Sequence, residues 1–164
     1  MDAYHFHHPE KMIDDRAELL EIIGEASFMT LAMIGRGEPY LSTMNYGFDP
    51  SRDCFFFHCA GDGKKLECLR TSPFVWGQVI EDRGYVPGKC DHAYRSVHFS
   101  GRVTFLETGP DKDAALELMI RQLEPDPEPV VQRLMARHAR IAQMTVGRID
   151  VLQMTGKRNA LELL

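Results

Sequence analysis

The stretch FFFHCAGDGKKLECLRTSP, Phe55–Pro73, joins an aromatic segment to a charged one through a glycine-containing turn. Its first part belongs to Cys54–His58, whose alternating side chains predict a strand. Its second part, Asp62–Thr71, predicts a short helix that ends before the proline. Asp62 is the expected N-cap, because an aspartate carboxylate accepts hydrogen bonds from the first free backbone N–H groups of a helix. The stretch therefore predicts a strand, a tight turn and a helix.

Two lysines, Lys64 and Lys65, stand in the first turn of this predicted helix. They repel each other, and the amino end of a helix dipole favours anions rather than cations. Small residues, free backbone N–H groups and two ammonium groups together are suited to binding a phosphate. The spacing of GDGKK is not that of a Walker A loop. The alternative is a solvated surface helix whose lysines pair with Asp62 or Glu67.

The composition of the 164-residue chain predicts one globular domain, residues 1–164, with a flexible terminus at residues 1–10. A domain of this size buries roughly two-thirds of its unfolded surface. The net charge of −5 lacks the basic footprint of a nucleic-acid-binding protein. Any anionic ligand should therefore be small and bound in a local cationic pocket.

Neither a membrane segment nor a secretory signal is expected. The longest apolar run lies within Phe28–Ile34 and is too short to span a bilayer, and the first residues have no apolar core. A cytoplasmic location follows as the default. The four cysteines form no CxxC pair and are expected to be free thiols, and no metal site is predicted.

Outward from the opening stretch, short turns connect most of the predicted strands, which favours antiparallel neighbours. The predicted strands are Ser27–Ile34, Tyr40–Phe48, Cys54–His58, Phe74–Ile80, Tyr94–Glu107 and Val146–Met154. A loop is expected over Glu81–His92, and the further helices are Lys11–Ala26, Asp111–Leu123 and Pro129–Met144. The pattern predicts a mainly β protein, a small closed antiparallel barrel with flanking helices.

Two predicted strands carry polar side chains that are candidates for ligand contacts. In Tyr94–Glu107, alternation places Tyr94, Ser96 and His98 on one face, and Arg95 lies near the start of the strand. In Tyr40–Phe48, hydroxyl and amide residues offer hydrogen bonds to a planar ring. Both patterns are also typical of the solvated face of an ordinary antiparallel sheet.

No catalytic side chain is identified. His58 and Cys59 are adjacent, but neighbouring strand residues point to opposite faces, which argues against a catalytic dyad.

Four segments in order, PYLSTMNYGF, FFFHCAGDGKKLECLRTSP, FVWGQVIED and YRSVHFSGRVTFLE, resemble the pyridoxamine 5′-phosphate oxidase-related flavoproteins. Within that family the chain is most similar to the 5-nitroimidazole-resistance (Nim) branch, over roughly Glu25–Lys157. The resemblance implies a six-stranded antiparallel FMN-binding split barrel. It also implies a homodimer with the flavins in the clefts between the subunits.

The resemblance further implies a set of cofactor-binding residues. The phosphate would be held by His58, Lys64 and Lys65, and the backbone of Cys59 and Ala60 would line its approach. The edge of the isoalloxazine ring would be met by Ser42, Thr43, Met44 and Asn45. The pocket would be completed, from either subunit, by Tyr94, Arg95 and Ser96. His98 departs from the family, which usually has an apolar residue at this position.

The function implied is a flavin-dependent oxidoreductase that reduces a small, planar, electron-poor compound, with NADH or NADPH as the donor. The alternatives are a non-catalytic flavin or haem binder, such as a sensor or reservoir, and a barrel that has lost its cofactor. The sequence leaves FMN, FAD and a deazaflavin open as the flavin, and it does not name the substrate. Neither a nucleic acid nor a membrane is expected as a partner.

Overall fold

The computed structural model of the chain describes residues 8–160, apart from the side chains of residues 138–140. Of the predicted flexible terminus, residues 1–10, the first seven lie outside the described residues. From there, Pro9–Lys11 forms a short 3₁₀ helix, η1. No helix in the described part of the chain is long and apolar enough to cross a membrane.

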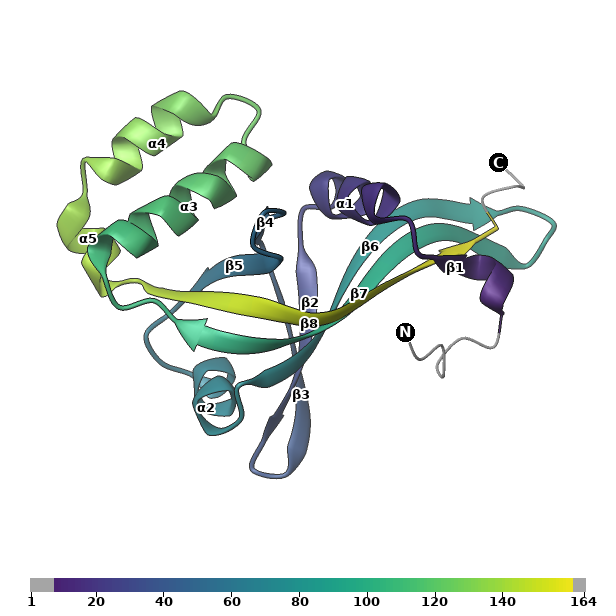
Figure 1. Cartoon of the computed structure of the whole chain (residues 1–164), viewed down its shortest axis with the longest axis horizontal. Helices are drawn as coiled ribbons and strands as arrows, with labels where there is room; N and C mark the ends of the chain where they lie inside the picture. Colours follow the sequence, from purple (N-terminus) through teal and green to yellow (C-terminus); the bar gives the residue numbers. More distant parts are fainter. Residues whose placement is uncertain (1–7, 161–164) are drawn as a thin grey trace.

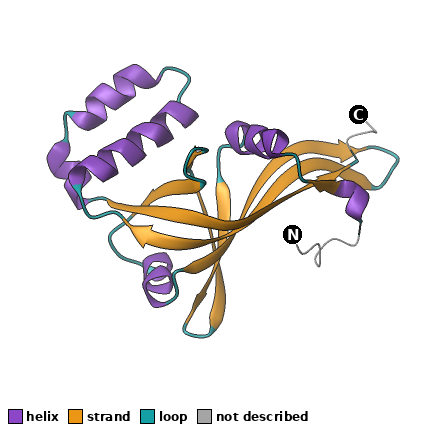
Figure 2. Ribbon diagram, viewed as in Figure 1, coloured by secondary structure: helices purple, strands orange, loops and turns teal. Residues whose placement is uncertain are grey.

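Eight strands and five α-helices make up the described residues, arranged as Figure 1 and Figure 2 show. The strands are β1 (Met12–Ile13), β2 (Met29–Gly35), β3 (Glu38–Met44), β4 (Gly47–Asp49), β5 (Cys54–Cys59), β6 (Phe74–Val86), β7 (Asp91–Phe105) and β8 (Thr145–Asn159). The helices are α1 (Arg16–Glu25), α2 (Lys64–Thr71), α3 (Gly109–Leu123), α4 (Pro127–Met135) and α5 (His138–Gln143).

All strands join one antiparallel sheet in the order β3-β2-β6-β7-β8-β5-β4, with β1 paired to β8. The strands at the two ends of this order, β3 and β4, follow one another in the chain. The sheet therefore curls without closing, and an opening remains beside β3. The predicted fold class, a mainly β split barrel with flanking helices, is confirmed, although the described sheet has eight strands rather than six.

The sheet separates two apolar cores, and β5 contributes to both. Phe55 and Phe57 point into the barrel, where Phe55 stacks on Phe99 with 4.2 Å between ring centroids. Phe56 points outward and packs beneath α3. Gly77 makes room for the ring of Phe99, because a Cβ atom there would lie 2.1 Å from it. The alternation predicted for β5 is confirmed, and it fixes which way His58 points.

Several predicted boundaries are wrong. The predicted helix over Lys11–Ala26 begins only at Arg16, because Met12–Ile13 pairs with β8 and the carboxylate of Asp15 caps the helix. The predicted strand Tyr40–Phe48 breaks into β3 and β4, because the buried hydroxyl of Tyr46 turns inward to donate to the carbonyl of Ile23.

The predicted loop Glu81–His92 is mostly strand, because β6 continues to Val86 and β7 begins at Asp91. Similarly, β8 extends to Asn159, beyond the predicted Met154. The predicted helix Pro129–Met144 is replaced by α4 and α5. Together with β1, the extra strand lengths form an arm, which Figure 1 shows at the right. We call residues 80–86, 91–97 and 155–159 with β1 the arm.

The side chain of Arg95 fastens α1 to the base of the arm. It is 8% exposed and lies among four carboxylates: Glu81 of β6 and Glu18, Glu21 and Glu25 of α1. The guanidinium donates to Glu21 at 2.9 Å and also donates to Glu81. Burial raises the pKa of Glu81, but the hydrogen bond and charge of Arg95 outweigh it and hold that pKa below its usual value.

Arg95→Met is expected to lower the free energy of unfolding by about 3 kcal/mol at pH 7, because it leaves enclosed carboxylates without their cation. The lowered pKa of Glu81 contributes stability that is present above about pH 4 and is lost as the pH falls further. The difference between wild type and variant should therefore shrink in acid. Urea unfolding at several pH values measures both effects.

Arg121→Met is the matched control, because Arg121 pairs with Glu117 and Glu128 on the solvated surface of α3. Exposed ion pairs contribute little, so its urea midpoint should stay that of the wild type. Equal midpoints for Arg95→Met and the wild type would contradict the fastening role.

Candidate functional site

Three segments far apart in the sequence meet at the opening of the sheet. Lys64 at the start of α2 lies over the ring of Tyr40 on β3, with its Nζ 5.0 Å from the ring centroid. Asn45, directly after β3, and His58, near the end of β5, line the same groove. The structure thus brings together the edge of β3, the end of β5 and the start of α2.

The amino end of α2 carries no side-chain cap. Gly63, not Asp62, occupies the N-cap position, so the predicted N-cap is wrong. Gly63 has a φ of +102°, a conformation that side chains other than glycine's rarely adopt. Because the first N–H groups of a helix have no acceptor within it, those of Lys64 and Lys65 are available to a ligand. This strengthens the phosphate interpretation.

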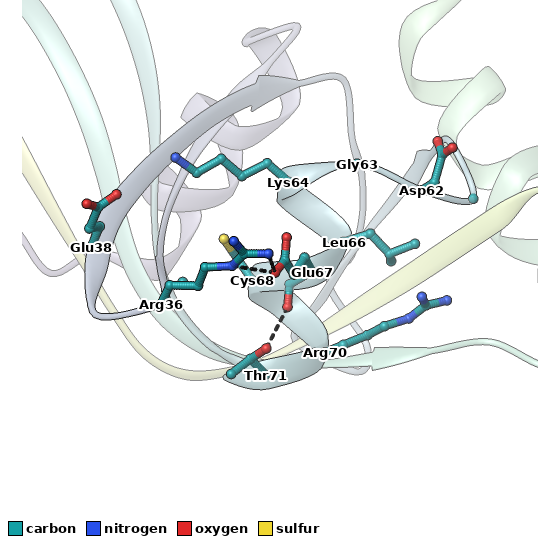
Figure 3. A pocket seen from close by; sticks show the side chains of 12 residues that line it. Arg36, Glu38, Asp62, Gly63, Lys64, Leu66, Glu67, Cys68, Arg70 and Thr71 are labelled. Atoms are coloured by element: carbon teal, nitrogen blue, oxygen red, sulfur yellow. Dashed lines mark hydrogen bonds and ion pairs between the residues drawn. The ribbon is translucent and has the colours of Figure 1, made fainter.

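The two lysines at the start of α2 have different neighbours. Lys64 lines a hollow of about 650 Å³, drawn in Figure 3. The floor of the hollow is α2, where Arg36 donates to Glu67 at 2.7 Å and Arg70 lies on the same helix. Because Glu67 is paired with Arg36, it is not available to neutralise Lys64.

Lys65 acts on the end of β5. Loss of solvent around the ring lowers the pKa of His58, and the positive charge of Lys65 lowers it further. The imidazole is therefore neutral at pH 7 and acts as a hydrogen-bonding group. Burial raises the pKa of Cys59 and outweighs the opposing charges of Lys65 and Arg70, so the thiol stays protonated. Cys59 also packs against the barrel core, on the side away from His58.

The edge strand β3 supplies the polar wall of the opening. Thr43 faces outward and shares a hydrogen bond of 3.0 Å with Thr30 of β2. Asn45 donates from Nδ2 to a backbone carbonyl that precedes β2, at 2.9 Å. The strand's alternation turns Ser42 and Met44 inward, and Met44 packs against the barrel core. The wall therefore offers one hydroxyl and one amide to a ligand. Ala60, just beyond β5, is exposed beside it.

The predicted residues Tyr94, Arg95 and Ser96 lie elsewhere. Their strand pairs there with residues 157–159 of β8, beside β1 in the arm. Figure 1 shows the arm at the right of the molecule and α2 at the lower left. Arg95 is enclosed by carboxylates, and the hydroxyl of Ser96 is buried without a hydrogen-bond partner. Within one chain, these three residues do not meet the segments at the opening.

Sequence reasoning missed a groove between the helices and the barrel end. It measures about 390 Å³, and we call it the α3–α4 groove. Its lining is Asn45, His58, Leu116, Met119, Ile120, Leu123, Glu124, Val130, Arg133, Leu134, Arg137 and Met144. The apolar positions of α3 and α4 could have suggested it, but their packing against one another cannot be read from either helix alone.

The described residues contain no cluster of histidine, cysteine, aspartate or glutamate side chains suited to holding a metal ion.

The chain belongs to the pyridoxamine 5′-phosphate oxidase family, whose sequence model matches residues 15–158. Among solved structures, it is similar to a 5-nitroimidazole antibiotic resistance protein from Bacteroides thetaiotaomicron, with 26% identity and a TM-score of 0.71 over 90% of this chain and 86% of that one. The predicted kinship with the family and its Nim branch is confirmed.

More distant structures share the fold. An FAD-binding protein from Mesorhizobium loti is 21% identical, with a TM-score of 0.65 over 92% of this chain and 98% of that one. A flavocytochrome from Azotobacter vinelandii is 17% identical, with a TM-score of 0.81 over 98% and 75% of the two chains. No curated protein matches the sequence significantly.

Proposed function

We propose that the protein binds FMN at the opening of its sheet and acts as a flavin-dependent oxidoreductase. The observation that carries the proposal is the amino end of α2, uncapped and flanked by two lysines at the edge of β3. Family membership and flavin-binding proteins of the same fold support it. The donor set fits a phosphate dianion, which matches both the helix dipole and the lysine charges.

The residues have separate tasks in this proposal. Lys64, Lys65 and the neutral imidazole of His58 hold the phosphate, and the backbone of Cys59 and Ala60 lines its approach. The ring edge lies along β3, where Ser42, Thr43, Met44 and Asn45 place hydrogen-bonding and apolar groups. FMN, when bound, supplies the redox chemistry, and the chain binds, orients and partly shields it. No described side chain is assigned a catalytic role.

The reaction proposed is the transfer of electrons from NADH or NADPH to a small, planar, electron-poor acceptor. The protonated thiol of Cys59 and the absence of a triad among the described residues are compatible with chemistry carried by the cofactor. The similarity to a nitroimidazole-resistance protein makes nitro compounds the first acceptors to test.

The active unit proposed is a homodimer joined through the outer face of the sheet. Ile34, Phe74, Trp76 and Leu152 are each about half exposed or more, and together they line one depression. Contiguous exposed apolar patches often mark protein–protein contacts. On the same face, His98 hydrogen-bonds Gln78 at 3.0 Å. A second copy would cover this patch and bring the partly exposed Tyr94 of its arm to the flavin, whereas Arg95 and Ser96 are buried within the arm.

Lys64→Ala/Lys65→Ala is expected to raise the Kd for FMN about 100-fold, because two charge-assisted contacts to the phosphate are lost. Quenching of flavin fluorescence on titration into the flavin-free protein measures it. Arg16→Ala/Arg121→Ala removes the same charge away from the opening and should leave the Kd unchanged. Equal affinity for all three proteins would refute the phosphate site.

The enzymatic part of the proposal is tested separately. Sustained NADH or NADPH oxidation that depends on an added nitro compound supports it. Tight FMN binding without turnover, across several donors and acceptors, would instead favour a non-catalytic flavin binder.

Trp76→Glu is expected to convert a dimer into a monomer, because a carboxylate would have to be buried in an apolar interface. Light scattering after size-exclusion chromatography gives the mass. Ala114→Glu, at an exposed position of α3, adds the same charge and should remain dimeric. A monomeric wild type, or a dimeric Trp76→Glu protein, would contradict the assigned interface.

A further inference from the structure

We propose that the α3–α4 groove is the acceptor pocket, and that it selects planar aromatic compounds bearing a carboxylate or similar anionic group. The inference rests on the proposed function, because it names the substrate class of the same flavin site. It goes beyond the flavin contacts, since most of the residues that line the groove belong to the helices and not to the opening of the sheet.

The position of the groove connects it to the proposed flavin site. Asn45, which we place at the edge of the flavin ring, and His58, which we place at its phosphate, both line the groove. A molecule in the groove therefore lies against the same two side chains as the flavin. The volume of about 390 Å³ is within the range of small-molecule sites.

The walls of the groove suit an apolar, flat body. They consist largely of Leu116, Met119, Ile120, Leu123, Leu134 and Met144. Methionine and leucine side chains adapt to flat ligands without leaving a buried polar group unpaired. Behind these walls, α3 packs on a core that contains Phe56 and Ile141, and this packing holds the helix in place.

The charges of the groove select an anion. Arg133 and Arg137 line it, and neither takes part in any salt bridge formed by the described residues. By contrast, Arg95, Arg121 and Arg148 are each paired with a carboxylate.

Glu124 is the one carboxylate that lines the groove, so one positive charge remains in excess. An arginine matches a carboxylate through two parallel N–H donors, and these charge-assisted hydrogen bonds are stronger than those to a neutral acceptor. His58 is neutral at pH 7 and adds no charge to the groove.

The reaction balances with the donor already proposed. Reduction of an aromatic nitro group to a nitroso group takes two electrons from one reduced nicotinamide and consumes one proton. It releases the oxidised nicotinamide and one water molecule.

The test compares two acceptors of similar size, 4-nitrobenzoate and 4-nitrobenzyl alcohol, with the FMN-loaded protein and NADH or NADPH. We expect kcat/KM to be about tenfold higher for the anion, and Arg133→Gln/Arg137→Gln to lose this preference. Arg16→Gln/Arg121→Gln, matched in charge, should keep it. Equal kcat/KM for the two acceptors in the wild type would overturn the inference while leaving the oxidoreductase in place.

A second readout requires no turnover. Calorimetric titration of the same protein with benzoate and with benzyl alcohol should detect binding of the anion only, weakened about tenfold in Arg133→Gln/Arg137→Gln. If benzoate binds in this way but no acceptor is reduced, the enzymatic proposal fails and the anion pocket stands without a substrate role. If the arginine variant instead loses affinity for FAD and keeps it for benzoate, the groove holds the adenylate half of a dinucleotide, and the inference is overturned.

Discussion

An uncapped helix end that already carries two lysines favours an anion, and the proposed site is arranged around this preference. The φ of +102° at Gly63 denies α2 the side-chain cap that Asp62 would have supplied. The helix then begins with free N–H groups and with two lysines in its first turn. In the folded chain, the nearest carboxylate on the helix, Glu67, is held by Arg36. A small dianion resolves this concentration of positive charge better than solvent does.

The topology explains why this helix end is reachable. The two end strands of the sheet, β3 and β4, are consecutive in the chain but do not pair with one another in the sheet order, so the barrel stays open between them. The opening exposes the edge of β3 to the start of α2 and to the α3–α4 groove. The same chain places the arm far from the opening (Figure 1), so a site that uses both needs two copies. The proposed cofactor site and the proposed dimer thus both follow from one open sheet.

The sequence predicted local features well where a single strong pattern controlled them. The alternation of β5 predicted that Phe55 and Phe57 share a core and that His58 and Cys59 point apart, and the structure confirms both. The strand-to-helix stretch and the family's motifs were enough to predict the fold class from the sequence. The prediction of a loop over Glu81–His92 was wrong because its polar residues belong to strands. Glu81 and Arg95 pair across β6 and β7, and these strands continue into the arm.

Tertiary contacts decided what the sequence could not. Nothing in the order of residues indicates that Arg95 meets three glutamates of α1. This contact encloses the side chain that the family resemblance had assigned to the flavin pocket. The α3–α4 groove likewise depends on how α3 packs on β5 and α4 packs on α3, and the sequence showed only a pair of flanking helices. The proposed dimer face is visible as apolar positions on β2, β6 and β8 only when the register of the sheet is known.

The most direct test of the account is the visible absorption spectrum of the purified protein, followed by the mass of any chromophore released on denaturation. The account predicts flavin bands and the mass of FMN, with FMN taken up from solution by any flavin-free fraction. A haem Soret band without flavin bands, or a colourless protein that does not bind added FMN, would contradict it. The mass of FAD in place of FMN would retain the flavin site but refute the cofactor assigned to it.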